Sequence, residues 1–390
     1  MGQFVAAALP VEKIEGASSW LLNKGHVEAA LTQIGGQLAP VTFKLGSKRI
    51  SPLSVAPWGK EKVDADTPAV VRALRGDFFC APFGGNAQAF NGEQHPVHGE
   101  SANSRWKLES AQQDAREMIA SFTLDTTTRK GNIRKEIRIL TSHTCIYSRD
   151  TLTRFSGPMP LGHHAMLNFP DGPMSATLAS GSFVFGQVCP AAFENPALKG
   201  YQALKPGATF KSLREVPMID GTVTDLTKYP ARPGFEDLVM LVSNPKERLG
   251  WNAVTFGREG YVWFALKDTR VLRNTVLWFS NGGRHYAPWN GRHRHVMGIE
   301  DVTAYFHYGL AESAGDNPLS RKDMPTAVEL SPTAPLDVNY IFGVAAIPSG
   351  FHRVTDIRAS ADRKSMVLTS TANQEVAVAV DLDWLYTGAK

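Results

Sequence analysis

Apolar and polar residues alternate along much of this chain. Residues 116–124, 133–140 and 145–155 carry β-branched or apolar side chains at near two-residue spacing, and the turn-like Lys130-Gly131-Asn132 separates the first two. The same alternation returns in residues 261–266, 276–279, 366–370 and 375–382. Gly, Pro, Asn and Asp residues stand between these segments, as they do between strands. The pattern therefore predicts an all-β protein built from successive antiparallel strands.

Helical periodicity is confined to two short stretches, residues 27–34 and 68–74. The sequence contains no solenoid-type repeat, low-complexity tract or sharp change of composition, so we expect residues 1–390 to form a single domain. Within it, residues 1–45 are predicted to be a peripheral N-terminal extension. Residues 190–235, rich in Pro, Gly and Lys without clear alternation, are predicted to be a long surface excursion.

Composition narrows the function classes. The chain is 43% hydrophobic and 20% charged, which is enough apolar surface for a real core. Its net charge of +4 is spread along the sequence and forms no basic stripe, which argues against a nucleic-acid partner. The 3 cysteines are widely spaced and suggest neither a disulfide framework nor a zinc site, so we expect a reducing, cytoplasmic location. No apolar run of about 18 residues or charged leader indicates membrane insertion or secretion.

Four segments gather Gly, Pro, His, Trp and charged residues in loop-like contexts. They are residues 75–85, residues 95–100 with the following Trp106, residues 162–170, and residues 278–301. Taken singly, each is also typical of a structural feature such as a buried strand entering a tight turn or a locally bonded histidine.

Two adjacent histidines and a glutamate in these segments are candidates for chemistry. His163 and His164 are adjacent in a strand-like stretch, and because neighbouring side chains of a strand face opposite ways, only one can point into a given cleft. Glu300 follows Gly298 and Ile299 in a similar context, where burying a carboxylate is costly without a partner or a task.

The order of these motifs resembles that of the aldose 1-epimerase (galactose mutarotase-like) superfamily. The matching features are an Arg-Gly strand ending in Pro-x-x-Gly, then His-Gly with a Trp downstream, then His-x-x-x-Asn-Phe, then Gly-x-Glu, spread over residues 75–301. The first of them is similar to the hexose-6-phosphate mutarotase branch. The resemblance implies a large antiparallel β-sandwich, the galactose mutarotase-like supersandwich, with its ligand cleft on a concave sheet face.

The resemblance also implies roles for individual residues. His164 matches the general acid, since Asn168 and Phe169 fit the residues that follow it, and Glu300 matches the general base. The implied substrate-binding residues are His98, which orients the sugar, Arg75, which binds it, and Asp237, which grips its hydroxyls. His163 stays a candidate in place of His164.

The sequence departs from the phosphate-using branch at one position. Where that branch has an Arg shortly after the His-Gly pair, this chain has Ala102, and Arg105 comes later, so phosphate recognition is left open.

Trp58, Trp278 or Trp289 could stack on a sugar or pack in the core. Arg284, Arg292 or Arg294 could bind an anionic sugar group or lie in a solvated loop. The sequence analysis places Trp289 and Arg292 among the substrate-binding candidates.

Mutarotation needs an acid and a base at one sugar ring, and histidine and glutamate supply both near neutral pH. We therefore expect an enzyme that interconverts sugar anomers through the open-chain aldehyde, acts on a small-molecule sugar as a monomer or homodimer, and needs no cofactor. We expect no metal either, since His285, His293 and His295 have Arg neighbours that repel a cation. The alternatives are a non-catalytic carbohydrate-binding protein and a carbohydrate lyase or hydrolase on a related β-sandwich.

Overall fold

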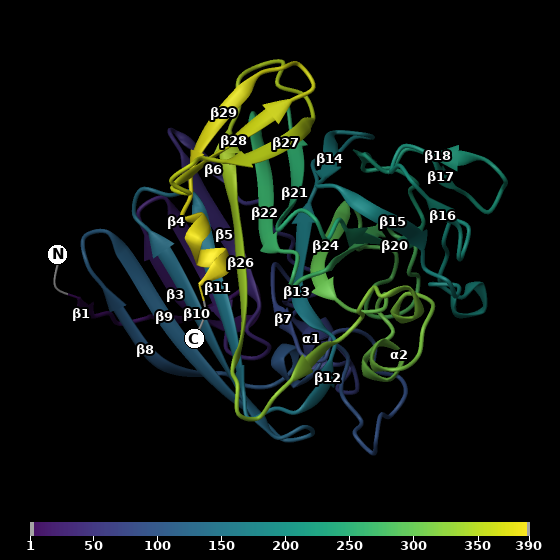
Figure 1. The fold of residues 1–390 in the computed structure, drawn as a ribbon, viewed down its shortest axis with the longest axis horizontal. Helices are drawn as coiled ribbons and strands as arrows, with labels where there is room; N and C mark the ends of the chain where they lie inside the picture. Colours follow the sequence, from purple (N-terminus) through teal and green to yellow (C-terminus); the bar gives the residue numbers. More distant parts are fainter. Residues whose placement is uncertain (1–3, 388–390) are drawn as a thin grey trace.

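A computed structural model describes residues 4–387, and it confirms the all-β prediction (Figure 1). Within this range there are 2 short α-helices, α1 (Ala69–Arg72) and α2 (Leu310–Ala314). The helix expected at residues 68–74 is present as α1. The one expected at residues 27–34 is wrong, because these residues form strand β4 (Val27–Thr32), which pairs with a strand on either side.

Two large antiparallel sheets form the body of the molecule. The 10-stranded sheet runs, in spatial order, β1 (Val5–Ala6), β8 (Lys107–Gln113), β9 (Glu117–Thr126), β10 (Gly131–Leu140), β11 (Cys145–Thr153), β26 (Leu336–Ala346), β22 (Tyr261–Asp268), β21 (Leu249–Phe256), β14 (Ala176–Ser180) and β19 (Lys228–Tyr229). The 7-stranded sheet runs β16 (Thr209–Phe210), β15 (Phe183–Val188), β20 (Glu236–Ser243), β23 (Asn274–Ser280), β24 (Val296–Thr303), β13 (Leu161–Asn168) and β7 (Phe79–Cys80).

The main core lies between these two sheets, and the two-residue period of each strand decides which side chains enter it. In β13, Leu161 and Ala165 join the same buried cluster as Ile133 of β10 and Phe342 of β26. Met166 of β13 belongs to a second cluster on the opposite face of the 7-stranded sheet. Neighbouring residues of β13 therefore lie on opposite faces of the sheet, one set in the main core and the other in the second cluster.

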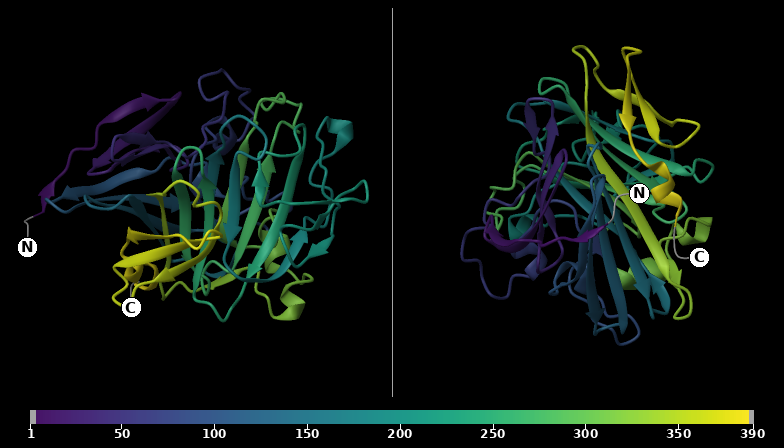
Figure 2. Two further views of the ribbon diagram at one scale, coloured as in Figure 1. Left: turned by 90° about the horizontal axis from the view of Figure 1, so that it is seen from above. Right: turned by 90° about the vertical axis from the view of Figure 1, so that its left-hand side faces the viewer.

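The N-terminal segment forms a sheet of its own, which corrects the expectation of a peripheral extension at residues 1–45. Trp20, Val41 and Phe43 are buried in the main core cluster, because one face of this sheet packs against the 10-stranded sheet, where the Trp20 ring contacts Phe122 and the Phe43 ring contacts Phe342. Figure 2 shows this N-terminal sheet and the C-terminal sheet on opposite faces of the 10-stranded sheet. The 5 strands are β2 (Val11–Ile14), β3 (Ala17–Lys24), β4, β5 (Leu38–Leu45) and β6 (Lys48–Ile50).

The C-terminal residues cover the outer face of the 10-stranded sheet. Val354 and Met366 lie in a buried cluster with Phe264 of β22, which closes that face against water. The elements of this layer are β27 (Val354–Ala359), β28 (Ser365–Ser370), β29 (Glu375–Ala379) and the 3-10 helix η4 (Leu382–Tyr386).

The segment between β15 and β20 contains only short elements, as its irregular sequence suggests, but it is not wholly superficial. Leu204, Val216 and Leu226 are fully buried in the main core. Its elements, besides β16 and β19, are η2 (Pro196–Leu198), β17 (Val216–Pro217) and β18 (Val223–Thr224). The remaining short elements of the chain are η1 (Glu100–Ala102), β12 (Gly157–Met159), η3 (Ser320–Lys322) and β25 (Val328–Leu330).

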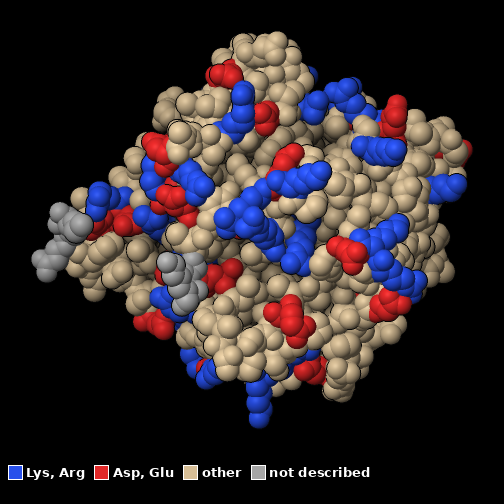
Figure 3. Space-filling view, in the orientation of Figure 1, with Lys and Arg blue, Asp and Glu red and all other residues tan. Residues whose placement is uncertain are grey.

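Charged side chains of both signs share the molecular surface. On the face in Figure 3, Lys and Arg side chains lie among Asp and Glu side chains, with the densest group of Lys and Arg near the centre. Among residues 4–387, no helix has the length and apolar character needed to cross a membrane.

Candidate active site

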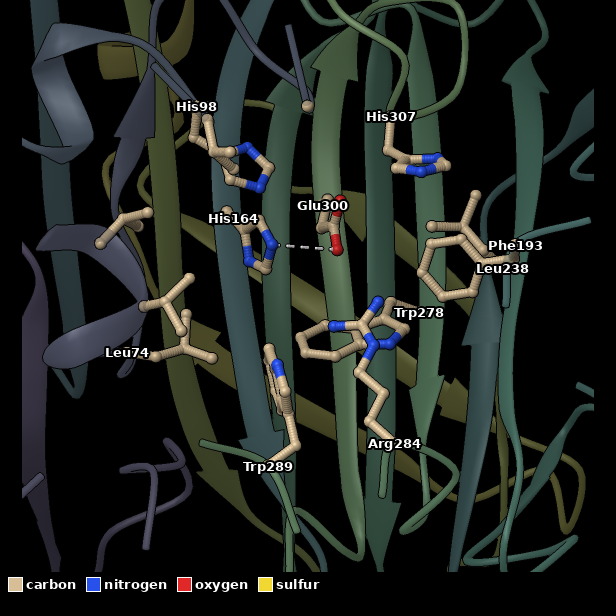
Figure 4. A pocket seen from close by; sticks show the side chains of 14 residues that line it. Leu74, His98, His164, Phe193, Leu238, Trp278, Arg284, Trp289, Glu300 and His307 are labelled. Carbon is tan, nitrogen blue, oxygen red and sulfur yellow. Dashed lines mark ion pairs between the residues drawn. The ribbon is translucent and has the colours of Figure 1, made fainter. Parts of the chain in front are cut away.

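A pocket of about 150 Å³ lies on the face of the 7-stranded sheet that is turned away from the main core. Residues of four strands, β13, β20, β23 and β24, form its floor, and α1 and loops from distant parts of the chain form its walls. Figure 4 shows the side chains of its aromatic and titratable residues converging on one space: His98, His164, Phe193, Trp278, Arg284, Trp289, Glu300 and His307.

His164 and Glu300 occupy the centre of this floor. They are direct cross-strand neighbours in the pairing of β13 with β24, which puts both side chains on one face of the sheet. His164 Nε2 lies 3.2 Å from Glu300 Oε1, and both residues are buried. The structure thus brings together the two residues that the sequence analysis expects to be the acid and the base.

Burial changes the proton affinity of both groups. Desolvation lowers the pKa of His164 to about 4 and raises that of Glu300 well above its ordinary value. Burial therefore favours the uncharged form of the pair, a neutral imidazole beside a protonated carboxyl group. This form carries the same number of protons as an imidazolium–carboxylate pair, so the two differ only in the position of one proton.

Two further histidines face the pair from the pocket walls. The His98 ring stands perpendicular to the His164 ring, with centroids 4.9 Å apart. The backbone N–H of His98 donates to Gly84 O at 2.7 Å. The His307 ring lies nearly perpendicular to the Phe193 ring, with centroids 4.8 Å apart. Burial lowers the pKa of His98 well below its usual value and that of His307 to about 4, so both imidazoles are neutral at pH 7. Neutral imidazoles can both donate to and accept from sugar hydroxyls.

Trp278 and Trp289 supply the apolar surfaces of the pocket. Their rings meet edge to face with centroids 5.8 Å apart. The Trp278 indole N–H donates to Glu236 Oε2 at 2.8 Å, and Ser280 Oγ donates to Glu236 Oε1 at 3.0 Å. Desolvation raises the pKa of Glu236 to about 7. Glu236 therefore fixes the orientation of an aromatic wall, and Trp289 lines the pocket as the sequence analysis expects.

His163 lies on the other side of the sheet, as strand alternation predicts. Its Nδ1 is 3.0 Å from Asp77 Oδ2, and its ring stacks on Tyr340 at 4.3 Å. Nearby, Lys135 Nζ is 2.7 Å from Asp150 Oδ1, so this face of β13 carries a buried ionic group. The structure does not bring His163 to the pocket, and His164 is the histidine that reaches it.

Arg75 also lies outside the pocket, which corrects its expected role in binding sugar. Its guanidinium is fully buried and donates to three backbone carbonyls, those of Ala73 at 2.7 Å, Ile14 at 2.9 Å and Glu15 at 2.7 Å. These bonds tie the N-terminal sheet to the main body and leave Arg75 no access to a ligand.

Asp237 is a second correction. The pairing of β20 with β23 points Glu236 and Leu238 to the pocket face, so Asp237 between them points the other way. Its Oδ1 accepts from the backbone N–H groups of Ala203 and Leu204, and its Oδ2 accepts from Arg232 Nε. Asp237 therefore anchors the segment that precedes β20.

Arg292 is the third candidate that the structure removes from the pocket. Its side chain is exposed, and its Nη1 and Nη2 donate to the two carboxylate oxygens of Glu61 at 2.6 and 3.0 Å. Arg284, eight positions earlier, is the arginine that lines the cavity.

Sequence reasoning missed three residues at this site. Glu236 stands beside the predicted Asp237, and the two-residue period of the strand would have separated them had the register been known. Phe193 and His307 come from irregular segments whose approach to the pocket depends on the tertiary fold, so no local signal marks them. In the described residues there is no group of three or more His, Cys, Asp or Glu side chains suited to a metal ion.

Solved structures superpose on this chain over most of its length. A galactose mutarotase-like protein from Clostridium acetobutylicum matches it with a TM-score of 0.58 at 13% sequence identity, covering 88% of this chain and 99% of that one. The chain has the galactose mutarotase-like fold. A proposed mutarotase from Salmonella typhimurium matches at a TM-score of 0.56 and 12% identity, over 88% of this chain and 97% of that one.

A proposed aldose 1-epimerase from Klebsiella pneumoniae adds a third mutarotase-like match, with a TM-score of 0.60 at 14% identity, over 85% of this chain and 80% of that one. No protein-family profile matches the sequence, and neither does any curated protein. At these identities the comparisons establish the mutarotase-like sandwich that the sequence predicts. Activity has to be argued from the pocket itself.

Proposed function

We propose that this protein is an aldose 1-epimerase that interconverts the α and β anomers of a monosaccharide. The observation that carries the proposal is the buried His164–Glu300 pair, 3.2 Å apart on the floor of a pocket in a mutarotase-like fold. Ring opening needs one group to protonate the ring oxygen and another to take the proton of the anomeric hydroxyl. Both oxygens are bonded to the anomeric carbon, so an acid and a base side by side serve both at once.

The roles follow the assignment that the family resemblance implies, with His164 as the acid and Glu300 as the base. Burial favours the uncharged pair, and moving its one proton from Glu300 to His164, 3.2 Å away, gives the imidazolium and the carboxylate with which ring opening begins. The open-chain aldehyde then rotates, and ring closure on its other face returns each proton to its starting group.

His98 and His307 hold sugar hydroxyls in this proposal, while Trp278 and Trp289 pack against the ring carbons. The protein side chains account for all proton transfers, so the reaction as proposed requires no cofactor.

Features of the pocket favour this reaction over the alternatives. A hydrolase needs two carboxylates flanking the scissile bond. Glu300 is the one carboxylate among the described residues that line this pocket, and Asp301 points to the opposite face, where its Oδ1 is 2.7 Å from Lys267 Nζ. A lyase that cleaves within a polysaccharide needs room on both sides of the bond, whereas the volume of about 150 Å³ at this pocket is on the scale of a single small ring.

The test is an anomer-exchange NMR screen over neutral, carboxylated and phosphorylated aldoses, with the variant Glu300→Gln. We expect exchange of at least one sugar by the wild type and a loss of about 100- to 10,000-fold in Glu300→Gln, with sugar affinity largely retained. The matched control is Glu61→Gln, a carboxylate outside the pocket that should exchange at the wild-type rate. Exchange no faster than in buffer for every sugar would refute the epimerase. Sugar binding that Glu300→Gln leaves unchanged, without any exchange, would instead indicate a non-catalytic binder.

A further inference from the structure

Arg284 presents unused hydrogen-bond donors to the pocket. Its Nε donates to Glu194 Oε1 at 2.6 Å, and this is its only side-chain hydrogen bond to the described residues. The two terminal nitrogens of the guanidinium make none. Figure 4 shows the guanidinium entering the cavity over Trp278, beside the His164–Glu300 pair.

The guanidinium is held in place before any ligand arrives. Its central carbon lies 4.5 Å from the ring centroid of Trp289, 5.2 Å from that of Trp278 and 5.1 Å from that of Phe193. Glu194, itself buried, fixes the Nε edge of the group. The two terminal nitrogens of the guanidinium therefore face the cavity. The side chain has little conformational freedom left to lose on binding.

The charges around Arg284 limit what it can bind. The other titratable groups lining the pocket are the three imidazoles and Glu300, so Arg284 is the one permanent cation among the described residues that line it. Glu194 already pairs with Arg284, and Glu236 lies beneath Trp278. Because these carboxylates offset the positive charge, a monoanion is less unfavourable here than a dianion. A planar carboxylate also matches the two parallel N–H groups of a guanidinium edge.

The volume of the pocket indicates how large the rest of the ligand can be. A volume of about 150 Å³ is on the scale of one ring, so a compact monosaccharide fits it best. A carboxylate bonded directly to the sugar ring adds less bulk than a phosphate ester.

We propose that the pocket takes a hexuronate, a monosaccharide whose carboxylate is bound by the terminal nitrogens of Arg284. The inference rests on the proposed epimerase function, because it assigns the substrate class of that same site. Arg284 is a specificity-determining residue in this view, and the His164–Glu300 pair performs the proton transfers.

The experiment compares glucuronate and galacturonate with glucose, galactose and glucose 6-phosphate. Anomer-exchange NMR gives kcat/KM for each, and saturation-transfer NMR gives binding without turnover. We expect the wild type to prefer a hexuronate over the corresponding neutral hexose by about 10- to 100-fold in kcat/KM, the scale of a charge-assisted hydrogen bond. The variant Arg284→Met should abolish that preference, and Arg284→Lys, which keeps the charge but loses the planar fork, should retain only part of it.

The matched control is Arg292→Met, an arginine outside the pocket that should keep the full preference. Thermal unfolding of each variant confirms that it is folded. Equal or better exchange of neutral hexoses by the wild type would overturn the inference while leaving the epimerase intact. A preference for glucose 6-phosphate would overturn the carboxylate assignment. Hexuronate binding that is lost in Arg284→Met, without exchange of any sugar, would support the ligand class and refute the epimerase.

Discussion

The two faces of β13 and β24 carry the same chemical groups in opposite circumstances. On the core face, His163 has Asp77 as a partner, and Asp301 has Lys267, Thr275 and Asn252 around one carboxylate oxygen. On the pocket face, His164 and Glu300 have each other, beside an open cavity.

The difference explains why we propose the pair on the pocket face, and not the groups on the core face, as the acid and the base. Groups on the core face have close charged or hydrogen-bonding partners, so removing one partner would leave a buried group uncompensated. The groups on the pocket face lose their hydration without gaining such partners, so burial dominates their proton affinity. Because successive side chains of a strand point to opposite faces, the adjacent residues His163 and His164 lie in these two different environments.

Of the single substitutions on the two faces, His164→Leu should reduce activity the most. It removes one half of the acid–base pair, so anomer exchange should fall by about 100- to 10,000-fold, measured by NMR on the best sugar. Its midpoint of denaturant unfolding should change far less than that of the His163 variant described next. Retention of more than a tenth of the activity would mean that His164 is not part of the pair.

The matched change on the core face, His163→Leu, should act on stability. It leaves the buried Asp77 carboxylate without its partner, and breaking a buried pair in this way costs about 3–5 kcal/mol of the free energy of unfolding. Denaturant titration measures this loss. The exchange rate per folded molecule should stay within a few-fold of the wild type, and an activity loss matching that of His164→Leu would show that the two faces are not independent.

The pH dependence of activity tests whether burial sets the proton affinity of the pocket pair, and its expected effect is smaller than those of the two variants. Because burial lowers the pKa of His164 to about 4 and raises that of Glu300, the pair holds one transferable proton across neutral pH. Below about pH 4 it gains a second proton and has no base, so activity should fall about tenfold per pH unit. The exchange rate between pH 3 and 8, with folding followed by circular dichroism, checks this. A fall centred near pH 6.5 would mean that His164 titrates as an ordinary histidine.

The sequence was sufficient for the fold class and for the central pair. Alternation marked most of the long strands, and the order of short motifs singled out His164 and Glu300, which pair directly in the structure. The predicted helix at residues 27–34 is a strand, because Val27, Ala29 and Leu31 lie in a short apolar run that suits either element.

The pocket walls were harder to predict for a physical reason. Arg75 and Asp237 have the right chemistry, but backbone groups distant in sequence satisfy them, and only the tertiary structure shows those partners. Arg284 and Arg292 look alike in one loop, yet one meets Glu194 and the other Glu61. The expected single domain, oligomeric state and cytoplasmic location stay predictions.

The segment that contributes Phe193 and Glu194 joins the Arg284 loop through a short ladder of backbone bonds. Tyr201 N donates to Gly283 O, and His285 N donates to Lys199 O. The two loops thus form one rim above the sheet floor that holds the His164–Glu300 pair. Exchanging residues 190–202 and 283–289 together would make this scaffold a platform for directed evolution of sugar selectivity, with the reacting strands untouched.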